Sequence, residues 1–243
     1  HVIDNLNKPG GQCAELYPEK PIYDIPSRVS ISGQQLTNDL LAQAKPFKPV
    51  YHFDQQVESI QKLESNHWLV KTSLDKYIQA KCIVIAAGAG SFVPRRLPIK
   101  DVEYLEDKNI LYAVRNKSVL EGKKLLIVGG GDSALDWTNE LSKISNVTLI
   151  HRRKEFKASP DSVSKMLELE NDKKINFLLG QIQNIEGLNN GKIKVVAYNN
   201  EITKKFEVDY LLPFFGLKME LGPIANWGLN LDKNLINVDT KKF

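Results

Sequence analysis

A glycine-rich hexapeptide in the middle of the chain limits the possible folds more than any other feature. It consists of Gly129, Gly130, Gly131, Asp132, Ser133 and Ala134. It follows the apolar run 125–128 and opens a helical pattern that extends to about Lys143, after which a second apolar run occupies 147–151. A strand, a glycine turn, a helix and a second strand form a βαβ unit, and its crossover requires a parallel sheet.

The hexapeptide fits the pattern G-x-G-x-x-A, which is typical of a dinucleotide-binding turn when it joins a strand to a helix. Gly129 allows the tight turn, a glycine at the next positions lets a pyrophosphate approach the backbone, and Ala134 lets the helix lie close to the strand. The helix N-terminus offers N–H groups and a positive dipole end to the phosphates. The sequence therefore predicts a dinucleotide site at 129–134.

A basic triplet follows the second strand of this unit. In a site for NAD, a carboxylate at this place accepts hydrogen bonds from the 2′-hydroxyl of the adenosine ribose. Here the residues are His151, Arg152 and Arg153, with Lys157 shortly after them. Arginine offers a planar, permanently charged fork that suits a 2′-phosphate. The triplet therefore favours NADP(H), and the alternative is a solvated strand end without a ligand.

Strand and turn patterns before and after the βαβ unit resemble each other. Before it, we expect a strand at 1–4, a helix from Ser32 or Gly33 to about Ala44, an antiparallel meander within 57–80, and a buried apolar strand at 82–88. After it, Asn189-Asn190-Gly191 predicts a hairpin, and 204–216 reads as one strand that enters a covered sheet. The repeated order indicates an α/β chain with two related units.

Composition excludes several classes of protein. The 243 residues are 42% hydrophobic, which is enough for one large or two ordinary domains, and the net charge of +4 is too balanced for a nucleic-acid protein. Cys13 and Cys82 give neither a disulfide framework nor a zinc-ligand spacing, which fits a reducing cytoplasmic compartment. No apolar run is long enough to span a bilayer.

Four segments together resemble a known family. They are GGQCAELYPEK at 10–20, GGGDSALDW at 129–137, HRRKEFKA at 151–158 and LGPIANWGL at 221–229. They are similar to segments of the thioredoxin-reductase-like flavoproteins and, within these, of the ferredoxin/flavodoxin–NADP reductases. The resemblance extends over essentially the whole chain.

The resemblance implies an α/β fold with two doubly wound nucleotide-binding domains, each with an antiparallel β-meander. An FAD-binding domain is expected at 1–105, an NADP(H)-binding domain at 106–223, and a return to the first domain at 224–243. Family members begin with a further strand and glycine loop and end with a further segment at the flavin. On this comparison the chain is expected to be truncated at both ends, and to bind NADP(H) better than FAD.

The resemblance also implies the activity. An oxidoreductase with FAD would pass electrons between NADP(H) and ferredoxin or flavodoxin, as a cytoplasmic homodimer that binds neither nucleic acid nor membrane. Thioredoxin reductases carry a C-x-x-C dithiol before the strand that leads into the glycine loop, whereas 111–116 contains no sulfur here. The alternatives are a disulfide reductase whose dithiol lies elsewhere, and a non-catalytic nucleotide-binding flavoprotein.

The FAD contacts that the resemblance implies are Asp4, Gly11, Gln12, Tyr17, Val57 and Phe92. Asp4 would bind the adenosine ribose and Tyr17 would stack on the flavin, although Tyr17 alternatively packs on the core. Val57 and Phe92 would line the FAD, or are equally core apolar residues. Neither a catalytic acid, base or nucleophile nor a metal is expected, because the flavin carries the chemistry. Arg95, Arg96 and Lys100 are expected either to attract an acidic electron-transfer partner or to form a solvated loop.

Overall fold

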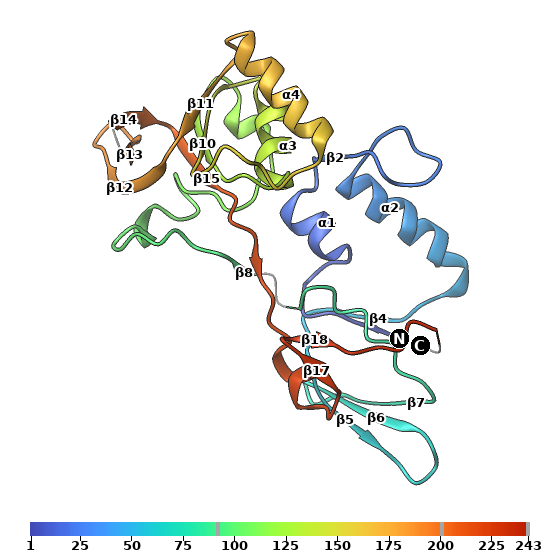
Figure 1. The fold of residues 1–243 in the computed structure, drawn as a ribbon. Coiled ribbons are helices and arrows are strands. Elements are labelled where there is room, and N and C mark those ends of the chain that lie inside the picture. Colours follow the sequence, from blue (N-terminus) through green and yellow to red (C-terminus); the bar gives the residue numbers. More distant parts are fainter. Residues whose placement is uncertain (91–92, 200–201, 242–243) are drawn as a thin grey trace. The chain divides into compact units, whose positions relative to one another are not determined.

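A computed structural model describes residues 1–90, 93–199 and 202–241. The chain divides into two compact units, each of which is built from separate segments (Figure 1). Unit 1 comprises 1–15, 23–93 and 218–243, and unit 2 comprises 16–22 and 94–217. After residue 22, the chain therefore passes from unit 1 to unit 2 at 93–94 and returns to unit 1 at 217–218. The short segment 16–22, which was predicted as part of the FAD domain, groups with unit 2.

Unit 2 is built on a sheet of four parallel strands. Their order is β11 (Ile175–Leu179), β10 (Asn146–His151), β9 (Lys124–Val128) and β15 (Tyr210–Pro213). Helix α3 (Asp132–Leu141) connects β9 to β10, and α4 (Pro160–Asn171) connects β10 to β11. The predicted βαβ unit and its parallel sheet are confirmed.

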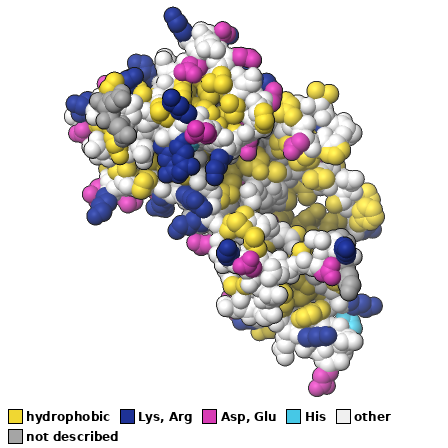
Figure 2. Space-filling view, viewed as in Figure 1, with side chains coloured by type: hydrophobic (Ala, Val, Ile, Leu, Met, Phe, Trp, Pro, Cys, Tyr) yellow, Lys and Arg dark blue, Asp and Glu magenta, His cyan; other side chains and the backbone are white. Residues whose placement is uncertain are grey.

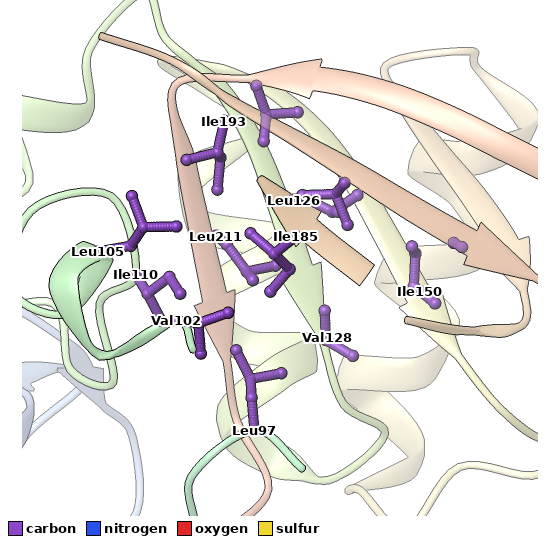
Figure 3. Close-up of a cluster of buried hydrophobic side chains, with 13 residues drawn as sticks. Leu97, Val102, Leu105, Ile110, Leu126, Val128, Ile150, Ile185, Ile193 and Leu211 are labelled. Carbon is purple, nitrogen blue, oxygen red and sulfur yellow. The ribbon is translucent and has the colours of Figure 1, made fainter. Parts of the chain in front are cut away.

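The two faces of this sheet bury different elements, because successive side chains of a strand point to opposite faces. Leu125 and Ile127 belong to a cluster with the buried residues of α3 and α4, such as Trp137. Leu126 and Val128 face the antiparallel meander of β12 (Gln181–Gly187), β13 (Ile193–Tyr198) and β14 (Thr203–Val208). Figure 3 shows this second cluster, which also includes Leu97, Val102, Leu105 and Ile110.

The predicted hairpin at 189–191 is confirmed, whereas the single strand predicted at 204–216 is wrong. The segment contains two strands in two sheets, β14 in the meander and β15 in the parallel sheet. Asp209 separates them, and both its backbone N–H and its carboxylate bond to the backbone of Lys124. The change from alternating to continuous apolar residues marks this change of sheet.

Unit 1 contains a short parallel pair, β1 (Val2–Ile3) with β4 (Tyr51–His52), and an antiparallel sheet. The sheet consists of β5 (Val57–Lys62), β6 (Trp68–Thr72) and β7 (Tyr77–Ala80), as the sequence predicts. Near the end of the chain, the helical turn η4 (Gly222–Asn226) packs against β5, where Trp227 Nε1 donates to the carbonyl of Glu58 over 3.3 Å.

The apolar strand predicted at 82–88 is wrong. These residues belong to no strand, and Val84 is 84% exposed. An extended segment gains stability from hydrogen bonds to a neighbouring strand, and among the described residues no strand pairs with this one. Apolar composition alone could not show whether a partner strand is present.

The remaining elements include one longer helix that starts at a side-chain cap. Helix α2 (Gly33–Ala44) begins after Ser32, which accepts a hydrogen bond from the N–H of Gln35. The other elements are α1 (Gly11–Leu16), β2 (Pro21–Ile22), β3 (Ile31–Ser32), η1 (Lys45–Phe47), β8 (Val93–Pro94), η2 (Glu103–Leu105), η3 (Ser118–Leu120), β16 (Leu217–Lys218), β17 (Leu231–Asp232) and β18 (Leu235–Ile236). None of the helices within the described residues has the length and apolarity that a bilayer crossing requires.

Candidate functional site

The glycine loop, residues Gly129–Gly131, lies between β9 and α3 at the carboxyl edge of the parallel sheet. Ligands of open α/β sheets bind at this edge. Gly131 is the N-cap of α3 and provides no side chain to the first turn. Asp132 and Ser133 follow as exposed residues, while Ala134 is completely buried against the sheet. The start of α3 is therefore an N-terminus without a side-chain cap.

Each glycine of the loop has its own surroundings. At Gly129, where φ is +154°, a Cβ would lie 2.5 Å from the carbonyl oxygen of Phe214 and 2.9 Å from the Cβ of Ala134. At Gly130 a Cβ would fall on the imidazole ring of His151. At Gly131 the nearest atom to a Cβ is the carbonyl oxygen of Lys157, 3.6 Å away. Packing thus excludes a side chain at the first two positions but not at the third.

The segment after β10 returns to this loop. We refer to Arg152–Lys157 as the basic loop. The backbone N–H of Lys157 donates to the carbonyl of Gly130 over 2.7 Å, and Lys157 and Gly131 form a parallel bridge. The next contact is the N–H of Ser159, which donates to the carboxylate of Asp132 over 2.8 Å. The structure therefore brings together the glycine loop and the basic residues, which the sequence predicts as parts of one site.

The cationic side chains at this place have no acidic partners. Arg152, Arg153, Lys154 and Lys157 are exposed, and in the described part of the chain none of them forms an ion pair. Figure 2 shows Lys and Arg side chains gathered near the end of β10. These four cations lie in a loop whose one carboxylate is Glu155, so they repel one another, and an anion bound among them would relieve an unfavourable charge arrangement.

His151, at the end of β10, contacts Glu155 and Phe156. Its Nε2 lies 3.2 Å from the carbonyl oxygen of Glu155, and its ring stacks on Phe156 with the centroids 5.2 Å apart. Because a carbonyl oxygen only accepts, Nε2 carries the hydrogen. Burial, together with the charges of Arg152 and Arg153, lowers the pKa of His151 below 6.5, against an opposing effect of the bond to Glu155. These effects together favour the uncharged form of His151.

Four of the residues predicted to contact FAD lie in unit 1. Asp4 follows β1, and its Oδ1 accepts a hydrogen bond from the N–H of Leu6 over 3.0 Å. Gly11 has φ +50° with open space where a Cβ would be, and the amide of Gln12 lies beside Gly88. Val57 is the first residue of β5 and is half-buried. Phe92 lies outside the described residues.

Tyr17, which the sequence predicts to stack on the flavin, lies in unit 2. It packs against the apolar cluster that contains α3, and the ammonium of Lys20 lies 5.6 Å from the centroid of its ring. Lys20 also pairs with Asp136 of α3, with Nζ and Oδ2 2.6 Å apart. The packed alternative that the sequence left open therefore describes the contacts of Tyr17 in this structure.

The second basic cluster of the sequence differs from the first. Arg96 pairs with the largely buried Glu106 at 3.1 Å, and Glu106 also accepts the hydroxyl of Tyr112 over 2.9 Å. Burial raises the pKa of Tyr112 to about 12, so this phenol donates throughout the physiological range. Arg95 and Lys100 are exposed. One of the three cations is thus neutralised locally, which weakens this cluster as an attractor for an acidic partner.

Two features of the site are missing from the sequence interpretation. One is α4, whose start a Ser-Pro-Asp sequence at 159–161 signals, since Ser159 caps the helix and Pro160 occupies its first turn. The other is the contact of the Asp132 carboxylate with the backbone before α4. Within the described residues, no three His, Cys, Asp or Glu side chains come together as metal ligands.

The family of the chain follows from comparison with known proteins. The model of the pyridine nucleotide-disulphide oxidoreductase family matches residues 17–240. The chain belongs to this family of nucleotide-dependent oxidoreductases.

Curated relatives narrow the assignment to ferredoxin–NADP reductases. The chain is 54% identical to the protein of that name from Parvibaculum lavamentivorans over 246 aligned residues, which cover 100% of the chain and 71% of the relative. The ferredoxin–NADP reductase of Mesorhizobium japonicum is 51% identical with the same coverage.

Solved structures agree on the fold. Thioredoxin reductase from Lactococcus lactis superimposes with a TM-score of 0.81 at 22% identity, covering 98% of this chain and 77% of that one. The thioredoxin reductase of T. acidophilum gives 0.80 at 21% identity, with 99% and 77% covered. The two-unit α/β fold expected from the sequence is that of thioredoxin reductases.

Proposed function

We propose that the protein is an NADPH-dependent FAD oxidoreductase that passes electrons between NADP(H) and ferredoxin or flavodoxin. The observation that carries the choice of NADP(H) is the set of exposed, unpaired cations that the basic loop holds beside the glycine loop. The names and high identity of the curated relatives support the reaction.

The residues present fit a dinucleotide with a 2′-phosphate. The pyrophosphate would approach Gly130 and Gly131, where the uncapped start of α3 offers backbone N–H groups and a positive dipole end. Asp132 and Ser133 would shape the first turn around it, and Ala134 keeps the helix close to the strand. The 2′-phosphate would lie among Arg152, Arg153 and Lys157, with His151 at its side.

FAD is the second proposed cofactor, held by Asp4, Gly11, Gln12, Val57 and Phe92. Gly11 and Gln12 present backbone and an amide at an open part of unit 1, and Asp4 stands at the carboxyl end of a parallel strand, where ribose-binding acids lie. When bound, FAD supplies hydride acceptance and electron release. The protein positions the two cofactors, and no acid, base or metal is required from the chain.

A disulfide reductase is the competing enzyme function. The thioredoxin reductases that share the fold are about one-fifth identical, which speaks for the fold and not for the substrate. Among the described residues Cys13 and Cys82 form no disulfide, and the segment 111–116 lacks a vicinal pair. Thioredoxin-dependent reduction of insulin that disappears in Cys13→Ser would favour this rival over the proposed function.

We expect anaerobic stopped-flow mixing of the flavin-loaded protein with NADPH to bleach the flavin much faster than mixing with NADH at equal concentration. Reduced flavin should then be reoxidised by added ferredoxin or flavodoxin. Equal rates with NADPH and NADH would contradict the assignment of the basic loop. Failure of either protein acceptor to reoxidise the flavin would instead favour a non-catalytic nucleotide-binding flavoprotein.

His151 provides a test that needs no turnover. In an NMR titration we expect its imidazole to show a pKa below 6.5, because burial and the neighbouring arginines disfavour the charged ring. NADP⁺ should raise this pKa, since a 2′-phosphate dianion nearby favours the charged ring, whereas NAD⁺ should raise it less. His151→Gln assigns the signal among the four histidines. Equal shifts with both nucleotides would place the 2′-phosphate elsewhere.

Compartment and assembly are further proposals. Two cysteines that form no disulfide among the described residues suit the reducing cytoplasm, and a homodimer rests on the family resemblance. Size-exclusion chromatography with light scattering should give the molar mass of a dimer, and the molar mass of a monomer would contradict the homodimer.

A further inference from the structure

The basic loop has an aromatic support that reaches from the core of unit 2 to the glycine loop. Phe177 on β11 packs against the cluster beneath α3 and α4, and its ring lies 5.6 Å from that of Phe156. Phe156 in turn stacks on His151 with an interplanar angle of 26°. The ring of His151 then fills the space that a Cβ of Gly130 would need. Three rings thus form a column whose last member touches the glycine loop.

The loop around this column is short and returns on itself. Between His151 and Phe156 the chain makes a turn that His151 closes, since its Nε2–H donates to the carbonyl of Glu155. The N–H of Lys157 then bonds to Gly130, immediately after Phe156. The backbone of the basic loop is therefore fixed at its two ends by His151 and by Lys157, with the Phe156 ring between them.

The cationic side chains of the loop are not held by ion pairs. Arg152 and Arg153 are exposed and form no ion pair in the described part of the chain, so their positions follow from the backbone that bears them. Holding a charge in place before the ligand arrives lowers the ordering cost of binding. A ring that fixes this backbone thereby affects recognition of the 2′-phosphate without touching it.

We propose that Phe156 is a positioning residue for 2′-phosphate recognition, acting through its stack on His151 and through the return of the basic loop to Gly130. The inference rests on the proposed function, since it concerns how the same site distinguishes NADP(H) from NAD(H). The ADP part that both nucleotides share would lie at the glycine loop, whereas the 2′-phosphate would lie at the basic loop. Phe156 therefore affects the affinity for NADP(H) more than the affinity for NAD(H).

The test uses Phe156→Leu, Phe156→Tyr and the control Phe206→Leu, with dissociation constants for NADP⁺ and NAD⁺ measured by calorimetry. Phe206 is partly buried on β14 in the other cluster, so its variant makes the same truncation away from the site. We expect Phe156→Leu to weaken NADP⁺ binding about three- to tenfold, the size of an aromatic pair's contribution, and NAD⁺ binding less than about twofold. Phe156→Tyr keeps the ring and should retain the wild-type ratio, as should Phe206→Leu.

The outcomes separate this inference from the proposed function. A wild-type protein that binds both nucleotides equally well overturns the proposed function and this inference with it. A wild type that prefers NADP⁺ together with a Phe156→Leu variant that keeps the preference overturns only the inference. An equal loss of affinity for both nucleotides in Phe156→Leu also contradicts the inference, because the ring would then have a general structural role. A loss of the NADP⁺ preference in Phe156→Tyr contradicts it as well, because that variant keeps the aromatic ring.

Discussion

Replacing Arg152 and Arg153 together by alanine is expected to weaken NADP(H) binding about 100-fold or more. A hydrogen bond to a charged group contributes about 1.5–3 kcal/mol, and about 1.4 kcal/mol corresponds to a factor of ten in affinity. Both side chains are exposed, so solvent screening places the expected effect at the lower end of the sum. NAD(H) lacks the 2′-phosphate, and its affinity should change less than about twofold.

The matched control for this double variant is Lys204→Ala with Lys205→Ala. These lysines are also adjacent, exposed and unpaired among the described residues of the same unit, but they lie on β14 in the meander. Dissociation constants for NADP⁺ and NAD⁺, each at two salt concentrations, are measured for both variants. If the lysine pair lowers NADP⁺ affinity as much as the arginine pair, general positive charge rather than the basic loop attracts the ligand.

Gly129→Ala is expected to destabilise the fold strongly and Gly131→Ala to leave its stability nearly unchanged, although the two positions lie two residues apart. A Cβ at Gly129 meets the carbonyl oxygen of Phe214 and the Cβ of Ala134, neither of which can move away easily. Overpacking and an unfavourable φ should together reduce the free energy of unfolding of unit 2 by about 3 kcal/mol or more. At Gly131 the only near atom is 3.6 Å away, and φ is −102°.

Gly131→Ala should therefore fold with its stability changed by less than about 1 kcal/mol. Its methyl group would stand where the phosphates are proposed to approach the start of α3, so the affinities for NADP⁺ and NAD⁺ should fall by the same factor. Urea unfolding of unit 2 can be followed by the fluorescence of Trp137, which is buried there, once Trp68 and Trp227 of unit 1 are replaced by Phe. Similar loss of stability in both glycine variants would contradict the packing described for the loop.

The local order of elements was predictable from the sequence where a pattern and its terminators coincide. Ser32 before an amphipathic run, the glycine loop between two apolar runs, and Asn189-Asn190-Gly191 between alternating segments each gave the element that the structure contains. Turn and cap residues act through their own backbone, so their effect is legible without knowledge of the rest of the fold.

Long-range pairing was not predictable in the same way. The segment 82–88 has the composition of a buried strand, yet it lies outside the sheets because pairing depends on a neighbour. The segment 204–216 reads as one strand, yet Asp209 separates two sheets. In both cases the sequence shows the tendency of the segment and the tertiary surroundings decide the outcome.

The candidate site divides in the same manner. The glycine loop and the cations were identified from residue types and spacing, since the chemistry of a phosphate requires them. The contact of His151 with Gly130 and the stack on Phe156 came only from the structure, because an aromatic residue in a basic segment has no sequence signal of its own. Tyr17 likewise matches a flavin-loop motif, while its contacts in the structure are with α3 and Lys20.

The location of the 2′-phosphate is the central claim, and a crystal structure of the protein with NADP⁺ tests it most directly. The phosphate oxygens should lie within hydrogen-bond distance of the guanidinium groups of Arg152 or Arg153, with the pyrophosphate at the start of α3. An adenosine end bound away from residues 151–157 would contradict the claim and remove the reason for choosing NADPH over NADH as the electron donor.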